Sequence, residues 1–381
     1  MPVNEGMAEL SDLLFRTSIG VYAVGMLGFG AEFAFSRLGR VAGSASAVDE
    51  AEAVDAADET AAKQAVLVGA APAGGGEVGT TGPSGGVPGR TDGRTSPAGD
   101  GSPRKGAGSA GADGVTPRAS VWIGRLAVVL TIVGWATHVG SVVTRAIAAD
   151  RVPWGNMYEF SSMICLIAVT TFLVLITRQP LRWLGVFVMV PVVLSMGFAG
   201  TVLYVAAGPL VPALDSYWLK IHVAGAIISS GVFLVSAVTT VLFLLKDRWE
   251  SRLAEVASGR AEASRAMRSR GGIVMRLPSS ATLDTITYRI IAFAFPIWTF
   301  AIIAGAIWAE AAWGRYWGWD PKETWSFITW VIYAAYLHAR ATAGWRGRRA
   351  AAVSLLAFSA LFIDYYLVNL VINGLHSYAG I

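Results

Sequence analysis

Long apolar stretches recur along the 381-residue chain. Most are about 18 to 27 residues long, and a helix needs about 20 apolar residues to cross a bilayer. Because backbone polar groups must be satisfied within lipid, each stretch is predicted to form a helix. The predicted spans are 13–35, 121–147, 158–177, 184–206, 221–245, 288–311, 325–340 and 351–372. The chain is therefore predicted to be an all-α polytopic membrane protein with about eight transmembrane helices.

The composition argues against a soluble globular protein. Hydrophobic residues make up 54% and charged residues 15% of the chain, whereas a soluble domain carries about 25% charged residues. The single cysteine, Cys165, excludes intrachain disulfides and a cage of thiolate metal ligands, and we expect it to be a small core residue. The sequence contains no phosphate-binding loop and no dinucleotide-binding fingerprint.

Segment 36–120 differs from the rest of the chain. It is rich in Gly, Ala, Pro, Ser and acidic residues and contains no aromatic residue. It cannot bury enough apolar surface to offset the entropy of ordering, so we predict a disordered cytoplasmic loop. Residues 1–12 contain no Lys or Arg, so a retained helix is expected rather than a signal peptide. The predicted organisation is a first helix in 1–35 with an outer N-terminus, the disordered loop, and a seven-helix core over 121–381.

Basic residues alternate between the links and predict the orientation of the helices. The link after the third helix contains Arg178 and Arg182, the link 246–276 contains eight Lys or Arg, and the link 341–350 contains three Arg. By the positive-inside rule these links face the cytoplasm. The links predicted to face outside, together with both termini, are 148–157, 207–220 and 312–324. This topology accounts for the basic charge, so we expect no nucleic-acid partner.

The loop 312–325 has an unusual aromatic content. An aromatic belt needs only one or two rings per helix end, whereas this loop carries four tryptophans and a tyrosine. We therefore predict a platform for a large planar ligand, with the lysine paired to an anionic group on that ligand and the acidic residues bracing the fold. The candidate site residues are Trp313, Tyr316, Trp317, Trp319, Asp320, Lys322, Glu323 and Trp325. The flanking Trp308 and Trp330 are expected to be belt residues.

Four histidines lie in or at the ends of the predicted helices. His222 opens the fifth helix and His376 follows the eighth, both on the predicted side of the tryptophan loop. Two neutral imidazoles facing each other across a planar ligand are how haem iron is held by two axial histidines. His338 lies about 20 Å along the seventh helix and is a candidate ligand of an inner site, with a hydrogen bond to a neighbouring helix as the alternative. His138 has no motif of its own and is expected to be structural.

The tryptophan loop resembles the WWD signature of haem-handling proteins, most closely that of the CcsA/CcsB/ResC-type proteins of system II cytochrome c biogenesis. Further agreement comes from 154–159, from 218–223, and from Asn369 with 374–378. The resemblance covers about 121–381. It implies that two outward-facing histidines, here His222 and His376, hold haem iron at the tryptophan loop, and that His338 is the inner iron ligand.

The resemblance also implies a function in cytochrome c biogenesis. Reduced haem b would cross the cytoplasmic membrane outward and be joined to the two thiols of a Cys-x-x-Cys-His apocytochrome c. The implied partners are a ResB-type membrane protein, apocytochrome c and thiol-reducing thioredoxin-like proteins. The chain would have no catalytic residue of its own beyond haem presentation, as part of a membrane cytochrome c synthase (haem lyase) complex. The alternatives are a system I-type haem exporter or ligase component, a non-haem polytopic transporter, and a structural scaffold.

Overall fold

The computed structural model describes residues 3–35, 117–209, 216–262, 273–372 and 374–376. The predicted disordered loop 36–120 lies outside the described residues except for its last four. Those four residues belong to a helix, so the predicted loop runs four residues too far. Parts of the predicted links 207–220 and 246–276 also lie outside the described residues.

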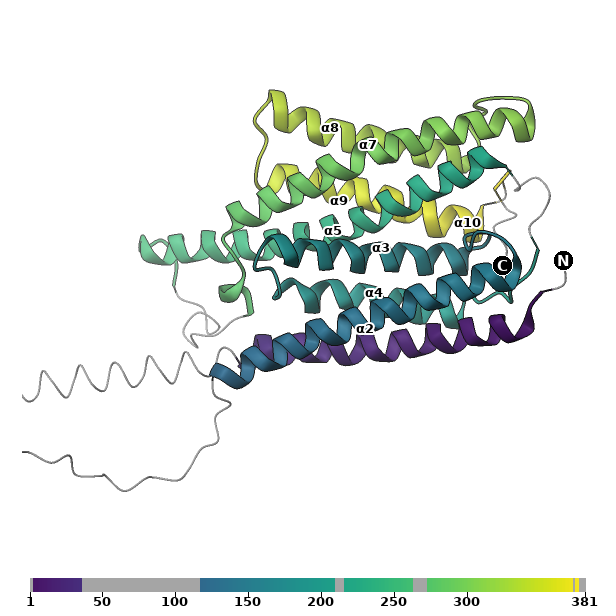
Figure 1. Cartoon of the computed structure of the whole chain (residues 1–381). Helices are drawn as coiled ribbons and strands as arrows, with labels where there is room; N and C mark the ends of the chain where they lie inside the picture. Colours follow the sequence, from purple (N-terminus) through teal and green to yellow (C-terminus); the bar gives the residue numbers. More distant parts are fainter. Residues whose placement is uncertain (1–2, 36–116, 210–215, 263–272, 373, 377–381) are drawn as a thin grey trace, which may run out of the picture. The chain divides into compact units, whose positions relative to one another are not determined.

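The compact unit formed by Met1–Arg37 and Pro117–Ile381 is a bundle of helices (Figure 1), without strands among its described residues. The prediction of an all-α polytopic membrane protein is confirmed. The helices are the N-terminal helix Glu5–Phe35, α2 (Pro117–Ala149), α3 (Met157–Arg178), α4 (Leu184–Thr201), α5 (Tyr217–Ala257), the short 3-10 helix Ile273–Arg276, α7 (Ser280–Trp313), α8 (Pro321–Thr342), α9 (Arg348–Phe362), a π-helical turn (Ile363–Leu367) and α10 (Val368–Val371).

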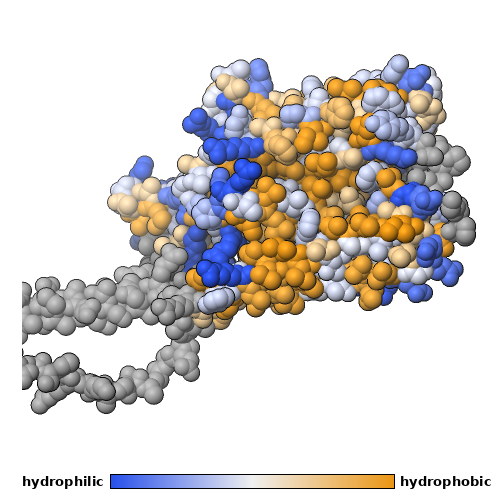
Figure 2. All heavy atoms as spheres, viewed as in Figure 1, coloured by the Kyte–Doolittle hydropathy of each residue, from blue (hydrophilic) through white to orange (hydrophobic). Residues whose placement is uncertain are grey.

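Seven helices among the described residues are long and apolar enough to cross a membrane. The predicted span missing from these seven is 325–340, which corresponds to α8; this helix is less apolar because it carries charged residues at both of its ends. Figure 2 shows apolar residues over the middle of the visible face and hydrophilic residues gathered towards its ends. Large apolar side chains such as Leu27, Leu194 and Phe293 are exposed, as a surface in contact with lipid requires.

Several helices extend beyond their predicted ends. The N-terminal helix begins at Glu5, eight residues before the predicted start at position 13. Helix α5 continues to Ala257, twelve residues beyond the predicted end at 245, and α7 begins at Ser280 instead of 288. The added turns are polar. Apolar stretches mark only the part of a helix within the hydrocarbon core, so polar turns outside it leave no such signal.

Helix α5 occupies the centre of the bundle and packs against α3, α7 and α9. Two of its glycines allow close approach: a Cβ at Gly225 would lie 3.0 Å from the Ala301 Cβ of α7, and a Cβ at Gly231 would lie 2.7 Å from Ile167 of α3. Small residues at such contacts let helix backbones pack tightly in membranes. The close pairing of α5 with α7 fixes the start of α5, where His222 lies, against α7.

One end of the bundle, here called the tryptophan end, carries the loop between α7 and α8. The start of the N-terminal helix and α10 lie at this same end (Figure 1). The links that follow α2 and α4 also meet there, since Arg145 near the end of α2 donates a hydrogen bond to the Val205 carbonyl after α4. The tryptophan end therefore gathers chain segments that are far apart in sequence.

Candidate functional site

The tryptophan loop folds back onto the bundle through two left-handed residues. Helix α7 ends at Trp313, and Gly314 has φ 68° while its amide donates to the Glu310 carbonyl at 2.8 Å. Trp319 has φ 59°, a conformation that a bulky side chain rarely adopts. Asp320 then caps the start of α8 in a capping box. The unusual backbone at Trp319 is the kind of local strain that accompanies functional loops.

A buried carboxylate braces this loop from inside. Glu323 Oε2 accepts hydrogen bonds from the amides of Gly318 at 2.8 Å and Asp320 at 3.1 Å. The Arg315 guanidinium lies 3.3 Å from the other carboxylate oxygen. Glu323 is itself buried. The conformation of the loop is therefore set by its own polar contacts.

Two adjoining pockets open at the tryptophan end. Six residues line both of them: Phe160, His222, Trp308, Lys322, Tyr365 and His376. The first pocket continues along the tryptophan loop, past Trp313, Tyr316, Trp317 and Glu323. The second continues along the start of α3 and α10, past Trp154, Asn156, Met157 and Asn369. The fold thus brings His222 and His376, which are 154 positions apart in the sequence, onto one shared wall.

Trp308 lies beside both imidazoles. Its ring centroid is 6.4 Å from that of His222, with the rings nearly parallel at 11°, and 6.0 Å from that of His376. Trp308 is only 2% exposed. The expectation that it is an interfacial belt residue is wrong, because a belt ring reaches the membrane–water interface whereas this ring is enclosed by α5, α7 and the segment after α10.

His222 is held by the backbone of α7. Its Nδ1 lies 2.7 Å from the Ala301 carbonyl oxygen. A carbonyl only accepts, so Nδ1 carries the proton and, in the neutral ring, Nε2 carries the lone pair. Gly305 allows this approach, since a Cβ there would lie 2.5 Å from Nδ1 of the ring. The ring orientation is therefore fixed by two residues of α7.

His376 is held by a carboxylate in the same manner. Its Nδ1 lies 2.9 Å from Asp320 Oδ2, and the Leu375 amide donates to Asp320 Oδ1 at 2.8 Å. Burial raises the pKa of Asp320, but the hydrogen bonds from His376 and Leu375 outweigh it and hold that pKa below its ordinary value. The ionised carboxylate accepts the Nδ1 proton, so Nε2 again carries the lone pair.

A cation and a carboxylate lie on the pocket wall. Lys322 Nζ donates to the Asp364 carbonyl at 3.1 Å and stands 5.7 Å from the Tyr365 ring centroid. This carbonyl belongs to the π-helical turn Ile363–Leu367, and such turns recur at functional sites. The Asp364 side chain is buried, and its Oδ1 has no hydrogen-bond partner among the described residues. The wall therefore presents one ammonium group beside one buried carboxylate, and an anionic group bound there would pair with the ammonium.

Four predicted site residues line neither of these pockets: Trp319, Asp320, Trp325 and His338. Trp319 is exposed and packs on Trp317 and Phe327 at centroid distances of 5.7 and 6.0 Å, lining neither pocket. Trp325 also lines neither. His338 is exposed on α8, where its backbone carbonyl accepts a hydrogen bond from the Thr342 hydroxyl at 2.8 Å.

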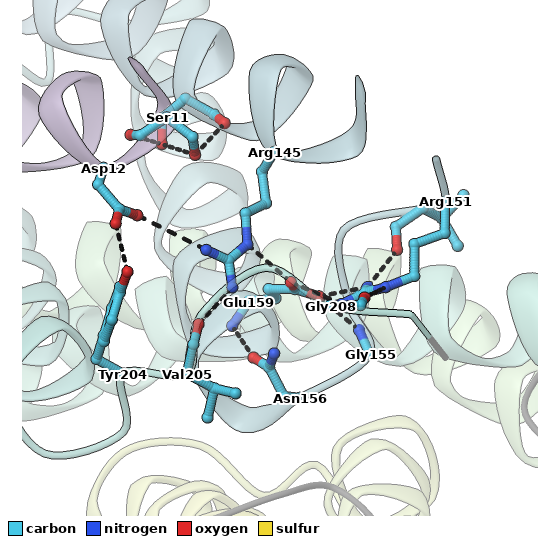
Figure 3. Close-up of polar contacts among 12 residues, drawn as sticks. Ser11, Asp12, Arg145, Arg151, Gly155, Asn156, Glu159, Tyr204, Val205 and Gly208 are labelled. Carbon is cyan, nitrogen blue, oxygen red and sulfur yellow. Dashed lines mark hydrogen bonds and ion pairs between the residues drawn. The ribbon is translucent and has the colours of Figure 1, made fainter. Parts of the chain in front are cut away.

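Buried ion pairs support the wall of the second pocket (Figure 3). The Glu159 carboxylate accepts from Arg145 Nε at 2.9 Å, Arg151 Nη1 at 2.7 Å and the Gly155 amide at 2.8 Å. Asn156 caps α3 by accepting the Glu159 amide at 2.9 Å. These contacts fix residues 154–157, which line the pocket.

The same network reaches two other elements. Arg145 lies 3.6 Å from Asp12 of the N-terminal helix, and Tyr204, after α4, donates to Asp12. Four segments therefore meet at one cluster of charges, which joins the N-terminal helix to the pocket wall.

Sequence reasoning did not assign several of the lining residues. Trp154, Asn156, Met157 and Asn369 fall in stretches that carried the family resemblance, so a signal existed for them. Phe160 and Tyr365 lie outside those stretches, and nothing in the local sequence marked them as lining residues. Their rings stack at 5.2 Å, and the Tyr365 hydroxyl lies 2.6 Å from that of Ser161.

His138 and Cys165 lie away from the pockets. His138 is fully buried, with Nε2 2.8 Å from the Ser162 hydroxyl and Nδ1 3.4 Å from the Tyr22 hydroxyl. Cys165 is a buried residue of the apolar core. Both ring nitrogens of His138 therefore have polar neighbours within the protein, as expected for a structural histidine.

The comparisons with known proteins cover this region. The profile of the family described as "Cytochrome C assembly protein" matches residues 154–376, so the match begins and ends on residues of the second pocket. The chain is 39% identical over 280 residues to the cytochrome c biogenesis protein CcsA of Gloeobacter violaceus, covering 63% of this chain and 82% of the relative. The CcsA protein of Porphyra purpurea is 35% identical over 282 residues, covering 67% of this chain and 88% of the relative.

Proposed function

Because the chain belongs to the cytochrome c assembly family, as a CcsA-type protein of system II cytochrome c biogenesis, we propose that its two adjoining pockets bind haem b and present it to apocytochrome c. Haem is a substrate in this function.

The pair of anchored imidazoles carries the proposal. A histidine that binds a metal typically donates its other ring N–H to a carbonyl or a carboxylate, as His222 and His376 do. Two imidazoles are too few to hold a bare transition-metal ion, and the described residues contain no group of three or more His, Cys, Asp or Glu that would hold one. Iron in a porphyrin already has four nitrogen ligands and needs only axial ones. The donor set therefore fits haem.

The other lining residues suit the rest of a haem molecule. Trp313, Tyr316 and Trp317 offer aromatic surface to the macrocycle. Lys322 would pair with a propionate, since its ammonium group stands on the wall common to both pockets. Asp320 and Glu323 fix the loop that carries these side chains. Trp319 and Trp325 would act through the fold of the loop, because they line neither pocket.

When bound, haem supplies the iron and the vinyl groups that are joined to cysteine thiols. This chain binds and orients the substrate and shields it from water. Cys165 is buried in the core, so the reacting thiols belong to the Cys-x-x-Cys-His motif of apocytochrome c, which thioredoxin-like proteins would keep reduced. The chain is thus one component of a membrane cytochrome c synthase complex.

A ResB-type membrane protein is the proposed partner. His338 is exposed on α8, and an ionisable side chain on a membrane-facing helix is costly without a partner. A second protein packed against α8 would cover it and supply the other ligand of an inner haem site. The protein would lie in the cytoplasmic membrane with the tryptophan end outside, the 36–120 insertion in the cytoplasm, and a seven-helix core over 121–381.

The test is the absorption spectrum of the chain purified with a ResB-type partner, together with cytochrome c maturation in the same cells. Wild type should carry haem with two nitrogen axial ligands. His222→Gly and His376→Gly should each lose or oxidise this haem and abolish maturation, and added imidazole should partly restore the reduced spectrum. His338→Gly should lower total haem. A colourless wild-type complex, or normal maturation in both of the first two variants, would contradict the proposal.

A further inference from the structure

Asp320 links the tryptophan loop to the segment that carries the second imidazole. One carboxylate oxygen accepts the Leu375 amide at 2.8 Å, and the other accepts His376 Nδ1–H at 2.9 Å and the Lys322 amide at 3.3 Å. Gly374 packs against the same group, since a Cβ there would lie 2.8 Å from Asp320 Oδ1. A single buried side chain therefore docks residues 374–376 onto the start of α8.

We propose that Asp320 is a positioning residue for haem, which holds His376 as the Nδ1–H tautomer and tunes it as an iron ligand. This inference rests on the proposed function, in which His376 binds the iron. A carboxylate that accepts the Nδ1 proton fixes the tautomer and ring orientation and makes the imidazole a stronger electron donor. A stronger donor favours ferric over ferrous iron, so the carboxylate lowers the reduction potential of the bound haem.

The two imidazoles are unequal in this respect. His222 donates to a neutral carbonyl, that of Ala301, whereas His376 donates to a carboxylate. A charge-assisted hydrogen bond is roughly twice as strong as a neutral one. The Asp320 carboxylate therefore increases the electron donation of His376 more than the Ala301 carbonyl increases that of His222.

A purely structural role for Asp320 makes a different prediction. As the cap of α8, Asp320 needs only to accept the Lys322 amide, and asparagine serves nearly as well in that position. Asp320→Asn leaves one amide oxygen to serve three donors: the Lys322 amide and His376 Nδ1–H on one side, and the Leu375 amide on the other. With the oxygen on the side of Lys322, the cap is preserved and the Leu375 amide faces the NH2 group. His376 Nδ1–H then donates to a neutral amide oxygen, so the substitution preserves the cap and removes the charged partner of the imidazole.

The experiment compares reduction potentials in the full chain purified with its ResB-type partner and bound haem, followed by optical redox titration. Asp320→Asn should shift the midpoint to a more positive value, and Asp320→Glu should return it part of the way. The control is Asp284→Asn at the opposite end of the bundle, where the carboxylate accepts two hydrogen bonds from Arg340 at 2.7 and 2.9 Å. Its midpoint should equal that of wild type.

A wild-type midpoint in Asp320→Asn overturns the proposal, because Asp320 would then act only as a cap. If Asp320→Asn does not accumulate, Gly374→Ala takes its place, since the added methyl displaces the Asp320 carboxylate from its present position. A wild-type midpoint in Gly374→Ala would also overturn the proposal. His376→Gly distinguishes a failure of this inference from a failure of the proposed function. If it retains the wild-type spectrum, His376 is not a ligand and the proposed function fails at this residue, whatever the effect of Asp320.

Discussion

Gly305 shows how closely the pocket wall is fitted around one imidazole. It lies in the interior of α7, where alanine would favour the helix by up to about 1 kcal/mol. A methyl group at this position would nevertheless lie 2.5 Å from His222 Nδ1 and 2.7 Å from its Cε1. The ring would have to rotate away from the Ala301 carbonyl. Here the space needed by the His222 ring outweighs the preference of the helix for alanine.

Gly305→Ala should therefore disturb haem binding without unfolding the protein. We expect a changed or lost haem spectrum at nearly wild-type thermal stability in detergent. The matched control is Gly197→Ala in α4, where a Cβ would meet no atom within 4 Å; it should keep the wild-type spectrum. An unaltered spectrum in Gly305→Ala would mean that the His222 ring does not need its present orientation.

Sequence analysis identified the residues that have a local signal in the sequence, and it missed those whose role depends on burial or on contacts between distant segments. His222 and His376 stand out because histidine is rare in an apolar helix and each lies near a helix end. Trp308 was misassigned because tryptophan near the end of an apolar helix is typical of the interface. In a helix that is apolar on all sides, no periodicity distinguishes the buried face from the lipid-exposed one. The contact of Asp320 with His376 spans 56 positions, and no local pattern predicts it.

At the scale of helices, the apolar stretches were predicted well because a bilayer demands a minimum length of apolar residues. Met157–Arg178 matches the predicted 158–177 to within one residue at each end. The polar end of α5 was missed because helical turns in water need no apolar run. Lys246 and Glu250 in that extension lie 3.8 Å apart at i,i+4 spacing, which favours helix.

The charged cluster at the start of α3 should be important for stability. Glu159 is 2% exposed and is shared by Arg145 and Arg151. Glu159→Gln takes the carboxylate away from Arg151 and leaves Arg145 with Asp12 alone, at 3.6 Å. Breaking a buried ion pair by removing one partner typically costs about 3–5 kcal/mol. We expect a marked fall in thermal stability in detergent. Glu255→Gln is the control, because its ion pair with Arg252 is exposed and worth at most about 1 kcal/mol. Equal stability of the two variants would show that the cluster does not hold the pocket wall.

At the scale of the whole molecule, the helical bundle forms a unit without residues 38–116. Deletion of about 45–115 should leave haem content and thermal stability close to wild type, since this segment has no aromatic side chain to contribute to a core. The remaining linker of about ten residues spans up to about 33 Å, and Glu32 of the N-terminal helix lies against Gly124 of α2. The measurements are the haem-to-protein ratio and the melting temperature. Loss of haem would show that the insertion has a role at the site.

The positions of the basic links predict the orientation of the bundle. Links 246–276 and 341–350 meet at the end opposite the tryptophan loop, since Arg348 forms an ion pair with Asp247 there. Each Lys or Arg near an anionic cytoplasmic leaflet contributes about 1 kcal/mol to the attraction to that leaflet, so this end should face the cytoplasm.

In a Cys165→Ala background, Arg260→Cys and Tyr217→Cys place thiols at exposed positions of the two opposite ends. A membrane-impermeant maleimide should label position 217 in intact spheroplasts and position 260 only after permeabilisation. Labelling of position 260 in intact spheroplasts would reverse the orientation and place the two anchored imidazoles on the cytoplasmic side, where apocytochrome c would not meet them.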